Sequence, residues 1–101
     1  MAQSKEAFKQ RVYEWAEKLD VKVQNLAVRP MKNKWASCST NGNLNFSIEL
    51  LVLDQELGDY VIVHELLHFR AHNHGKLWKS LMHTYLGDYE KLENKLRIYS
   101  R

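Results

Sequence analysis

The sequence predicts an α+β fold: a small antiparallel sheet of about three strands packs on a central apolar helix, with three further helices around it. Several segments carry apolar residues at the three- and four-residue steps of amphipathic helices. Between them, apolar and polar residues alternate, and an Asn-Gly pair separates two extended runs. A chain of 101 residues, 45% of them hydrophobic, is expected to form a single domain over residues 1–101.

The N-terminal segment is predicted to be an amphipathic helix that begins after Ser4, a residue type suited to the N-cap. Its apolar stripe consists of Phe8, Val12, Trp15, Ala16 and Leu19. Charged residues interrupt this segment and every other apolar run, which excludes a secretory signal and a membrane helix. Together with a single cysteine, this favours a soluble cytoplasmic protein without a membrane partner.

The next part of the chain is predicted to form the sheet. Residues 21–29 are rich in β-branched side chains, and Pro30 should end this strand or place it at an edge. The extended runs 34–39 and 43–48 flank Asn41-Gly42. Because both residues of this pair tolerate positive φ, they predict a tight hairpin.

Three helices should follow the sheet. Asp54 can cap a short turn, and Gly58-Asp59 is interpreted as a break followed by a new N-cap. The helix that begins there is apolar nearly all round, which predicts a central buried position. A third helix should end near Gly87, and a fourth should run from Asp88 to Ser100.

The motif His64-Glu65-Leu66-Leu67-His68 predicts a metal site on the central helix. Two histidines four residues apart lie on the same helix face, about 6 Å apart along the axis, so both imidazoles can bind one ion. Glu65 is the candidate base, because a carboxylate in an apolar helix is costly unless a metal and its water provide partners. A catalytic zinc uses three protein ligands and keeps one position open for water.

His74 is the predicted third ligand. A continuous helix would place His72 about 12 Å from His64 along the axis, too far to share an ion. His74 can return to the site if the helix ends two or three residues before it, and Asn73 and Gly75 are residue types that allow such a reversal. The remaining alternatives are the downstream carboxylates Glu90 and Glu93.

Three motifs resemble those of the YgjP-like zinc metallopeptidases. Trp35-Ala36-Ser37-Cys38 is similar to their Trp-Gly-Ser-Cys strand, residues 60–68 read Tyr-Val-Ile-Val-His-Glu-Leu-Leu-His, and Asn73-His74-Gly75 is followed by Trp78. The match covers Met31 to about Leu96, and the size and plan are similar to those of the minigluzincins, which are minimal zincins. Ala36 replaces a glycine of the family pattern, and Gly75 replaces a serine, as in SprT-like proteins.

This resemblance implies a minimal zincin-like fold with one Zn²⁺ per chain, bound by His64, His68 and His74. It implies Glu65 as the general base of a zinc-dependent metalloendopeptidase of the HExxH type, acting on a peptide or unfolded protein. It also implies that a substrate adds as a β-strand along the hairpin strand Leu44 to Ser47. A donor for the oxyanion is expected among Tyr85, Tyr89, Tyr99 and His83.

Other functions are less favoured by the charge distribution. Net charge is +3, and the basic residues are spread along the chain, whereas nucleic-acid binders usually concentrate them. The alternative to an enzyme is a non-catalytic, zinc-stabilised binding module that could associate with nucleic acid. A DNA-associated protease similar to SprT-like proteins would combine both functions.

Two further residues or segments have more than one interpretation. Cys38 could be a small buried residue of the sheet, a fourth zinc ligand that keeps the enzyme latent, or a reactive thiol. The last helix, Asp88 to Ser100, is expected to pack on the core. A second hypothesis for this helix is that it covers the cleft or exchanges with another copy of the chain.

Overall fold

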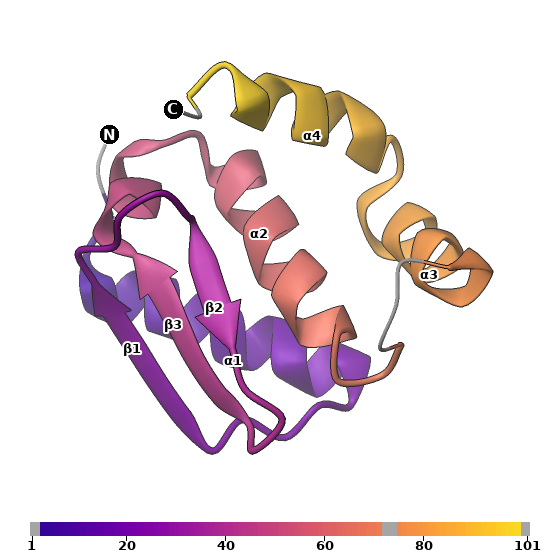
Figure 1. The fold of residues 1–101 in the computed structure, drawn as a ribbon, viewed down its shortest axis with the longest axis horizontal. Helices are drawn as coiled ribbons and strands as arrows, with labels where there is room; N and C mark the ends of the chain where they lie inside the picture. The colour runs from indigo at the N-terminus through magenta and orange to yellow at the C-terminus, as the bar shows by residue number, and fades with distance from the viewer. Residues whose placement is uncertain (1–2, 72–74, 100–101) are drawn as a thin grey trace.

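The computed structural model describes residues 3–71 and 75–99. Figure 1 shows the sheet lying against α1, with α2 beside it and α3 and α4 beyond α2. The helices are α1 (Lys5–Leu19), α2 (Gln55–Leu67), α3 (Lys76–Leu86), α4 (Tyr89–Arg97) and a short 3-10 helix η1 (Ile48–Val52). The strands are β1 (Asn25–Arg29), β2 (Ala36–Cys38) and β3 (Asn43–Ser47). None of the described helices is long and apolar enough to cross a membrane.

Helix α1 follows the prediction. The Ser4 hydroxyl accepts a hydrogen bond from the Ala7 N–H at 3.0 Å, which satisfies one of the donors that a helix start leaves free. The predicted stripe faces inward, although Trp15 is only half-buried. The helix ends at Asp20, which adopts the left-handed conformation (φ 57°). The residues of α1 that are buried are Phe8, Val12, Ala16 and Leu19.

The sheet has the predicted number of strands but is mixed, so the prediction of an antiparallel sheet is wrong for one pair. The strand order is β1-β3-β2, with β1 parallel to β3 and β2 antiparallel to β3. After β1, the connection 30–35 carries the chain across the sheet, so β2 runs back at the far edge and the hairpin inserts β3 between them (Figure 1). Sequence patterns show which residues are extended but not which strands are neighbours.

The boundaries of the first strand and the hairpin turn also differ from the prediction. Strand β1 starts only at Asn25, because Val21, just after the end of α1, still donates its N–H to the Ala16 carbonyl of that helix at 2.9 Å. The hairpin is present, but residues 39–42 connect its strands, and in the Asn-Gly pair only Gly42 has positive φ (86°). Strand β1 ends before Pro30 at a sheet edge, as predicted.

Helix α2 is continuous through Gly58-Asp59, so the predicted break is wrong. Gly58 is buried against α1, where an added Cβ would lie 3.5 Å from Phe8 Cε1. The Asp59 carboxylate accepts hydrogen bonds from Arg11 and from Trp15 Nε1, the latter at 2.9 Å. Gly58 therefore lies at the contact between the two helices, with room for a Cβ, and Asp59 joins the helices instead of capping one.

The remaining helices lie where they were predicted, although α4 ends at Arg97, before the predicted end at Ser100. Gly87 ends α3 with positive φ (67°), and the Asp88 side chain caps α4 by accepting the Lys91 N–H at 3.2 Å. Helix α2 is buried on most sides, which confirms its central position. Its buried residues are Leu57, Gly58, Tyr60, Val61, Ile62, Val63, Leu66 and Leu67.

Substitution of Gly58 by alanine should stabilise the protein by about 0.5–1 kcal/mol. The new Cβ would contact Phe8 at an ordinary distance in the folded state, and it would lower the conformational entropy of the unfolded chain. Urea unfolding followed by tryptophan fluorescence measures the change. The matched variant Gly42→Ala should instead destabilise, because its φ is 86° and its Cβ would lie 2.9 Å from Gln24 Cγ. A lower free energy of unfolding for Gly58→Ala would contradict this prediction and would mean that the contact between α1 and α2 has no room for a Cβ at this position.

Candidate metal centre

The last turn of α2 brings together three side chains that can bind a metal ion. Ligand atoms of His64, Glu65 and His68 all lie within 4.8 Å of one another, and the two imidazole centroids are 5.0 Å apart. The helix ends at Leu67, but His68 keeps helical dihedrals (φ −60°, ψ −24°) as the C-cap. The four-residue spacing therefore still aligns both rings on one face, and this donor set fits a small divalent cation.

Two aromatic side chains hold the His64 ring in place. Trp78 of α3 lies perpendicular to it with ring centroids 5.3 Å apart, and Tyr60, one turn earlier in α2, lies 5.8 Å away. Trp78 itself packs against Tyr89 of α4, at 5.8 Å. Sequence reasoning did not assign these roles, although Tyr60 and Trp78 were both part of the recognised motifs. Packing from two other helices thus restricts the orientation of this candidate ligand.

Glu65 is largely buried and ionised. Burial by itself raises its pKa, but the hydrogen bond with His64, the charges of His64 and His68, and an interaction with the Cys38 thiol together lower it below the usual value. Its Oε2 lies 3.0 Å from His64 Nδ1. A carboxylate that is ionised at neutral pH can accept a proton, as a general base must.

Cys38 lies on β2 close to Glu65. Burial, followed by the negative charge of Glu65 and a hydrogen bond with it, raises the pKa of Cys38 to about 11. The thiol is therefore protonated at neutral pH, which argues against the interpretation as a reactive thiolate. Among the described residues, the cluster that could bind a metal does not include Cys38, so the geometry does not support a fourth ligand either.

Two cavities flank Glu65, one on each side of the point where β2 approaches α2. The cavity beside His64 has a volume of about 280 Å³, and the cavity beside His68 has a volume of about 460 Å³. The first is lined by Lys34, Trp35, Tyr60, Val61, His64, Glu65, Glu93, Leu96 and Arg97. The second is lined by Ser37, Cys38, Ser39, Thr40, Glu65, His68 and Phe69. The Trp35–Cys38 motif therefore contributes to both walls.

The prediction that a substrate adds as a β-strand along Leu44 to Ser47 is wrong. These residues belong to β3, which is central and pairs with β1 on one side and β2 on the other, so its backbone cannot accept another strand. In the part of the chain that the structure describes, the sheet edge on the side of the metal centre belongs to β2, which pairs with β3 alone. The alternating pattern of β3 identified a strand correctly but carried no information about its place in the sheet.

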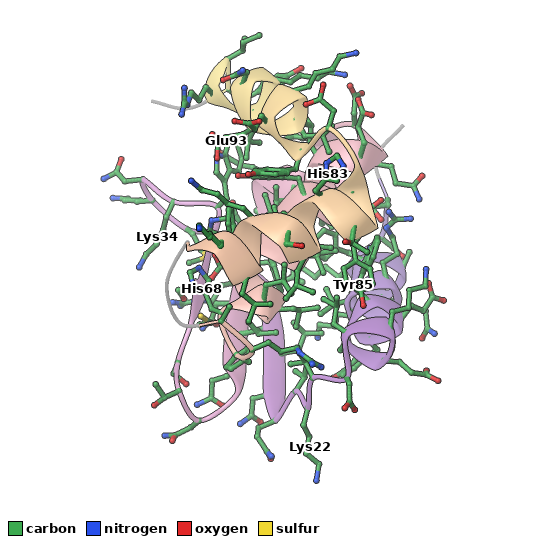
Figure 2. The ribbon with its side chains drawn as sticks, turned by 90° about the vertical axis from the view of Figure 1, so that its right-hand side faces the viewer. Lys22, Lys34, His68, His83, Tyr85 and Glu93 are labelled. Carbon is green, nitrogen blue, oxygen red and sulfur yellow. The ribbon has the colours of Figure 1, made fainter. Side chains whose placement is uncertain are left out.

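Helix α4 lies beside the site and is attached to α2 at two levels. Lys95 binds the carboxylates of Asp54 at 3.0 Å and Glu56 at 2.8 Å, at the start of α2. One turn further along α2, the Tyr60 hydroxyl donates to Glu93 at 2.9 Å. Figure 2 shows Glu93, Lys34 and His68 along one side of the molecule. The C-terminal helix therefore packs on the core as expected; its exchange with a second copy stays a hypothesis.

The remaining predicted site residues are the third metal ligand and the candidates for the oxyanion donor. The third ligand, His74, and His72 lie outside the described residues, so the structure does not test them. Among the oxyanion candidates, Tyr85 packs against Trp15 of α1 at 6.3 Å, and Figure 2 shows Tyr85 and His83 on the other side of the view from His68. The remaining candidates are Tyr89, which packs on Trp78, and Tyr99, which is exposed beyond α4.

A family model described as "YgjP-like, metallopeptidase domain" matches residues 1–99. The chain belongs to the YgjP-like metallopeptidase family. An uncharacterized protein of Methanocaldococcus jannaschii is 33% identical over 81 residues, which are 76% of this chain and 74% of that protein. The family assignment confirms the resemblance found in the three sequence motifs.

Two solved structures are similar to this member of the YgjP-like family. The crystal structure of the metallopeptidase zymogen of Methanocaldococcus jannaschii jannalysin has a TM-score of 0.78 and 32% identity, over 91% of this chain and 93% of that one. The metallopeptidase zymogen of Pyrococcus abyssi abylysin has a TM-score of 0.76 and 20% identity over the same shares, which shows the fold alone. The predicted minimal zincin-like α+β fold is thereby confirmed.

Cys38 should react with iodoacetamide roughly 100-fold more slowly at pH 8 than the same cysteine in the urea-unfolded chain, because its raised pKa leaves little thiolate. Mass spectrometry of timed aliquots measures both rates. The rate in the folded protein should rise as the pH approaches 11. Equal rates in the folded and unfolded chains at pH 8 would contradict the protonated thiol.

Proposed function

We propose that this YgjP-like protein is a zinc-dependent endopeptidase that uses His64, His68 and His74 as metal ligands and Glu65 as general base. The observation that carries the proposal is the convergence of the His64, Glu65 and His68 ligand atoms within 4.8 Å in a chain of metallopeptidase fold. When bound, zinc supplies a Lewis acid that acidifies water and polarises a carbonyl. Zinc suits this donor set, because neutral imidazole is among its preferred ligands.

The assignment of His74 as third ligand is supported by the path of the chain on both sides of it. His68 ends the metal helix, and Trp78, only four residues after His74, contacts the His64 ring at 5.3 Å. The chain is thus back at the site by Trp78, which is four residues after His74 in the sequence. The alternative ligand Glu93 lines the same cavity as His64, but its carboxylate already binds the Tyr60 hydroxyl at 2.9 Å and Arg97 at 3.4 Å.

Glu65 is suited to move the proton in hydrolysis. Its pKa is lowered, so it is ionised and able to take a proton from the attacking water, and it can then deliver this proton to the leaving amine. The substrate, a peptide or unfolded protein, would lie along the free edge of β2, between the two cavities that share Glu65. Backbone hydrogen bonds to this edge would hold it extended.

Glu65→Gln should abolish hydrolysis while leaving zinc binding nearly unchanged, because the amide keeps the shape of the side chain but cannot accept the proton. The measurement is turnover of a fluorescent casein substrate by zinc-loaded protein, together with zinc content. Glu90→Gln, an exposed position on α4, is the matched control and should retain full activity. Undiminished turnover by Glu65→Gln would remove Glu65 from the mechanism.

His74→Ala should weaken zinc binding at least tenfold, because it removes one of three ligands, whereas the neighbouring substitution His72→Ala should change it less than twofold. Competition with a chromophoric zinc chelator measures both dissociation constants. Glu93→Gln is the second control. A tenfold loss in Glu93→Gln with no loss in His74→Ala would assign the third ligand to α4 instead.

The same preparations test the alternative function. Tight zinc binding with no hydrolysis of any unfolded protein, together with salt-dependent DNA binding, would favour a zinc-stabilised binding module. The presence of an ionised carboxylate beside two imidazoles favours the enzyme, because a closed structural site would use four protein ligands and needs no base.

A further inference from the structure

We propose that a polar pocket at the hairpin end of the site binds the carboxylate side chain of a substrate Asp or Glu that lies N-terminal to the cleaved bond. Arg70 and Lys22 are the residues that recognise this carboxylate. This inference rests on the proposed function, because it names the class of peptide that the same site takes. It assigns a role to side chains that the metal centre does not use.

The basic pocket, as we call it, has a volume of about 270 Å³ and is formed by three segments of the chain. They are the connection between α1 and β1, the hairpin turn between β2 and β3, and the residues after α2 (Figure 1). The Gln24 N–H donates to the Gly42 carbonyl at 2.9 Å, which joins the first two segments. Arg70 joins the third segment to α1, because its Nη1 donates to the Leu19 carbonyl at 2.7 Å. The polar side chains that line the pocket are those of Asp20, Lys22, Gln24, Thr40, Asn41 and Arg70.

The basic pocket adjoins the cavity beside His68. Thr40 and Phe69 line both of these hollows, and the cavity beside His68 is also lined by Glu65. A peptide that lies along β2 and continues past the hairpin turn therefore passes from the reacting groups to the basic pocket. The substrate residue that reaches this pocket is further from the cleaved bond than the residue that lies beside His68.

The direction of β2 indicates which side of the cleaved bond the basic pocket serves. A peptide that pairs antiparallel with β2, the slightly more stable arrangement, runs from the Cys38 end toward the Ala36 end. The hairpin turn follows Cys38, so the N-terminal part of the peptide lies at the basic pocket. The C-terminal carboxylate of a peptide would lie at the other end of β2. The carboxylate that the pocket binds is therefore that of a side chain.

The charges of the basic pocket favour an anion. Arg70 and Lys22 contribute two positive charges and Asp20 contributes one negative charge, so the net charge is +1. None of the three takes part in an ion pair between described residues. A guanidinium has five N–H donors, and the bond to Leu19 uses only one of its nitrogens. The remaining donors of Arg70 can bind both oxygens of a carboxylate.

Arg70 is oriented before a ligand arrives. Leu19 is the last residue of α1, where helix carbonyls have no partner within the helix, and the guanidinium binds this carbonyl. The positive charge of Arg70 also lies at the negative end of the helix dipole. Less side-chain freedom is therefore lost when Arg70 binds a carboxylate, which favours binding.

Lys22 and the neutral lining residues add to this recognition. Lys22 is exposed, and Figure 2 shows it below His68 at the lower end of the view, so it attracts a carboxylate from solvent. The Thr40 hydroxyl and the Asn41 amide are further donors at the pocket. Phe69 offers an apolar surface to the methylene groups of a Glu or Asp side chain. The volume of the pocket suits one such side chain.

Cleavage of a peptide library by the zinc-loaded chain tests this assignment. The peptides are amidated at the C-terminus, so that every carboxylate belongs to a side chain, and mass spectrometry identifies the cleavage sites. At one position before the cleaved bond, Asp and Glu should be favoured roughly fivefold over Asn and Gln. A profile in which Asp and Glu are not enriched at any position before the cleaved bond would overturn the proposal.

Two charge changes in the pocket should move this preference in opposite directions. Lys22→Glu should abolish the enrichment, because it makes the net charge of the pocket negative, whereas Asp20→Asn should raise the enrichment roughly twofold. Lys32→Glu, an exposed position outside the pocket, changes the charge of the chain equally and should give the parent profile. Equal losses in Lys22→Glu and Lys32→Glu would mean that the overall charge selects the peptide, which would overturn the proposal.

Arg70 is tested by the ratio of acidic to neutral peptides that are cleaved. Arg70→Gln should lower this ratio roughly fivefold, and Arg70→Lys should retain part of it, because the ammonium keeps the charge but not the paired donors. If Arg70 only held the end of α1, both classes of peptide would be cleaved less and the ratio would not change. Circular dichroism verifies that the variants are folded. An unchanged ratio in folded Arg70→Gln would overturn the proposal.

A binding measurement separates failure of this inference from failure of the proposed function. Zinc-loaded Glu65→Gln is titrated with acetyl-Glu-Glu-Ala-Phe-Ala-amide and with the peptide that has Gln at both Glu positions, and the NMR signals of the Arg70 side chain are followed. Roughly fivefold tighter binding of the acidic peptide, with shifts at Arg70 and a smaller difference at high salt, supports the pocket even if the parent cleaves nothing. In that case only the hydrolytic proposal fails. Equal affinity, or no binding of either peptide, overturns the pocket, while hydrolysis by the parent would still support the proposed function.

Discussion

The burial of α2 is the constraint on which the rest of the structure depends. This helix packs against α1, α3, α4 and strand β2, so its large buried apolar side chains each stabilise the fold by roughly 1.5–3 kcal/mol. The same packing fixes the last turn of the helix, which carries the candidate metal ligands. His64 and His68 therefore lie together on one face of the helix end, and Glu65 is held beside them although its burial is unfavourable.

The surrounding elements then determine what this turn can do. Trp78 and Tyr60 restrict the His64 ring, while Cys38 and the edge of β2 lie over Glu65. Helix α4 completes one cavity, and β2 forms an edge of the sheet among the described residues. In a chain of this size, α2, α3, α4 and β2 thus contribute both to the core and to the site, as expected when little surface can be spared.

Much of this could be predicted from the sequence, because the decisive signals are local. The Ser4 cap, the stripe of α1 and the histidine spacing each depend on neighbours within one or two turns. The errors concern contacts between distant residues. Gly58 and Asp59 are residue types that often stand at a helix start. Their contacts are with Phe8 and Arg11 of α1, which no local sequence pattern predicts. The parallel pairing of β1 with β3 was missed for the same reason.

X-ray absorption spectroscopy of the zinc-loaded protein at neutral pH tests the central claim most directly, because it reports the atoms bound to the metal. The account predicts one zinc per chain with three imidazole nitrogens at about 2.0–2.1 Å and one further oxygen, which leaves an open coordination position. A sulfur shell at about 2.3 Å, which would place Cys38 on the metal, or zinc bound by four protein ligands would contradict a catalytic centre of this design.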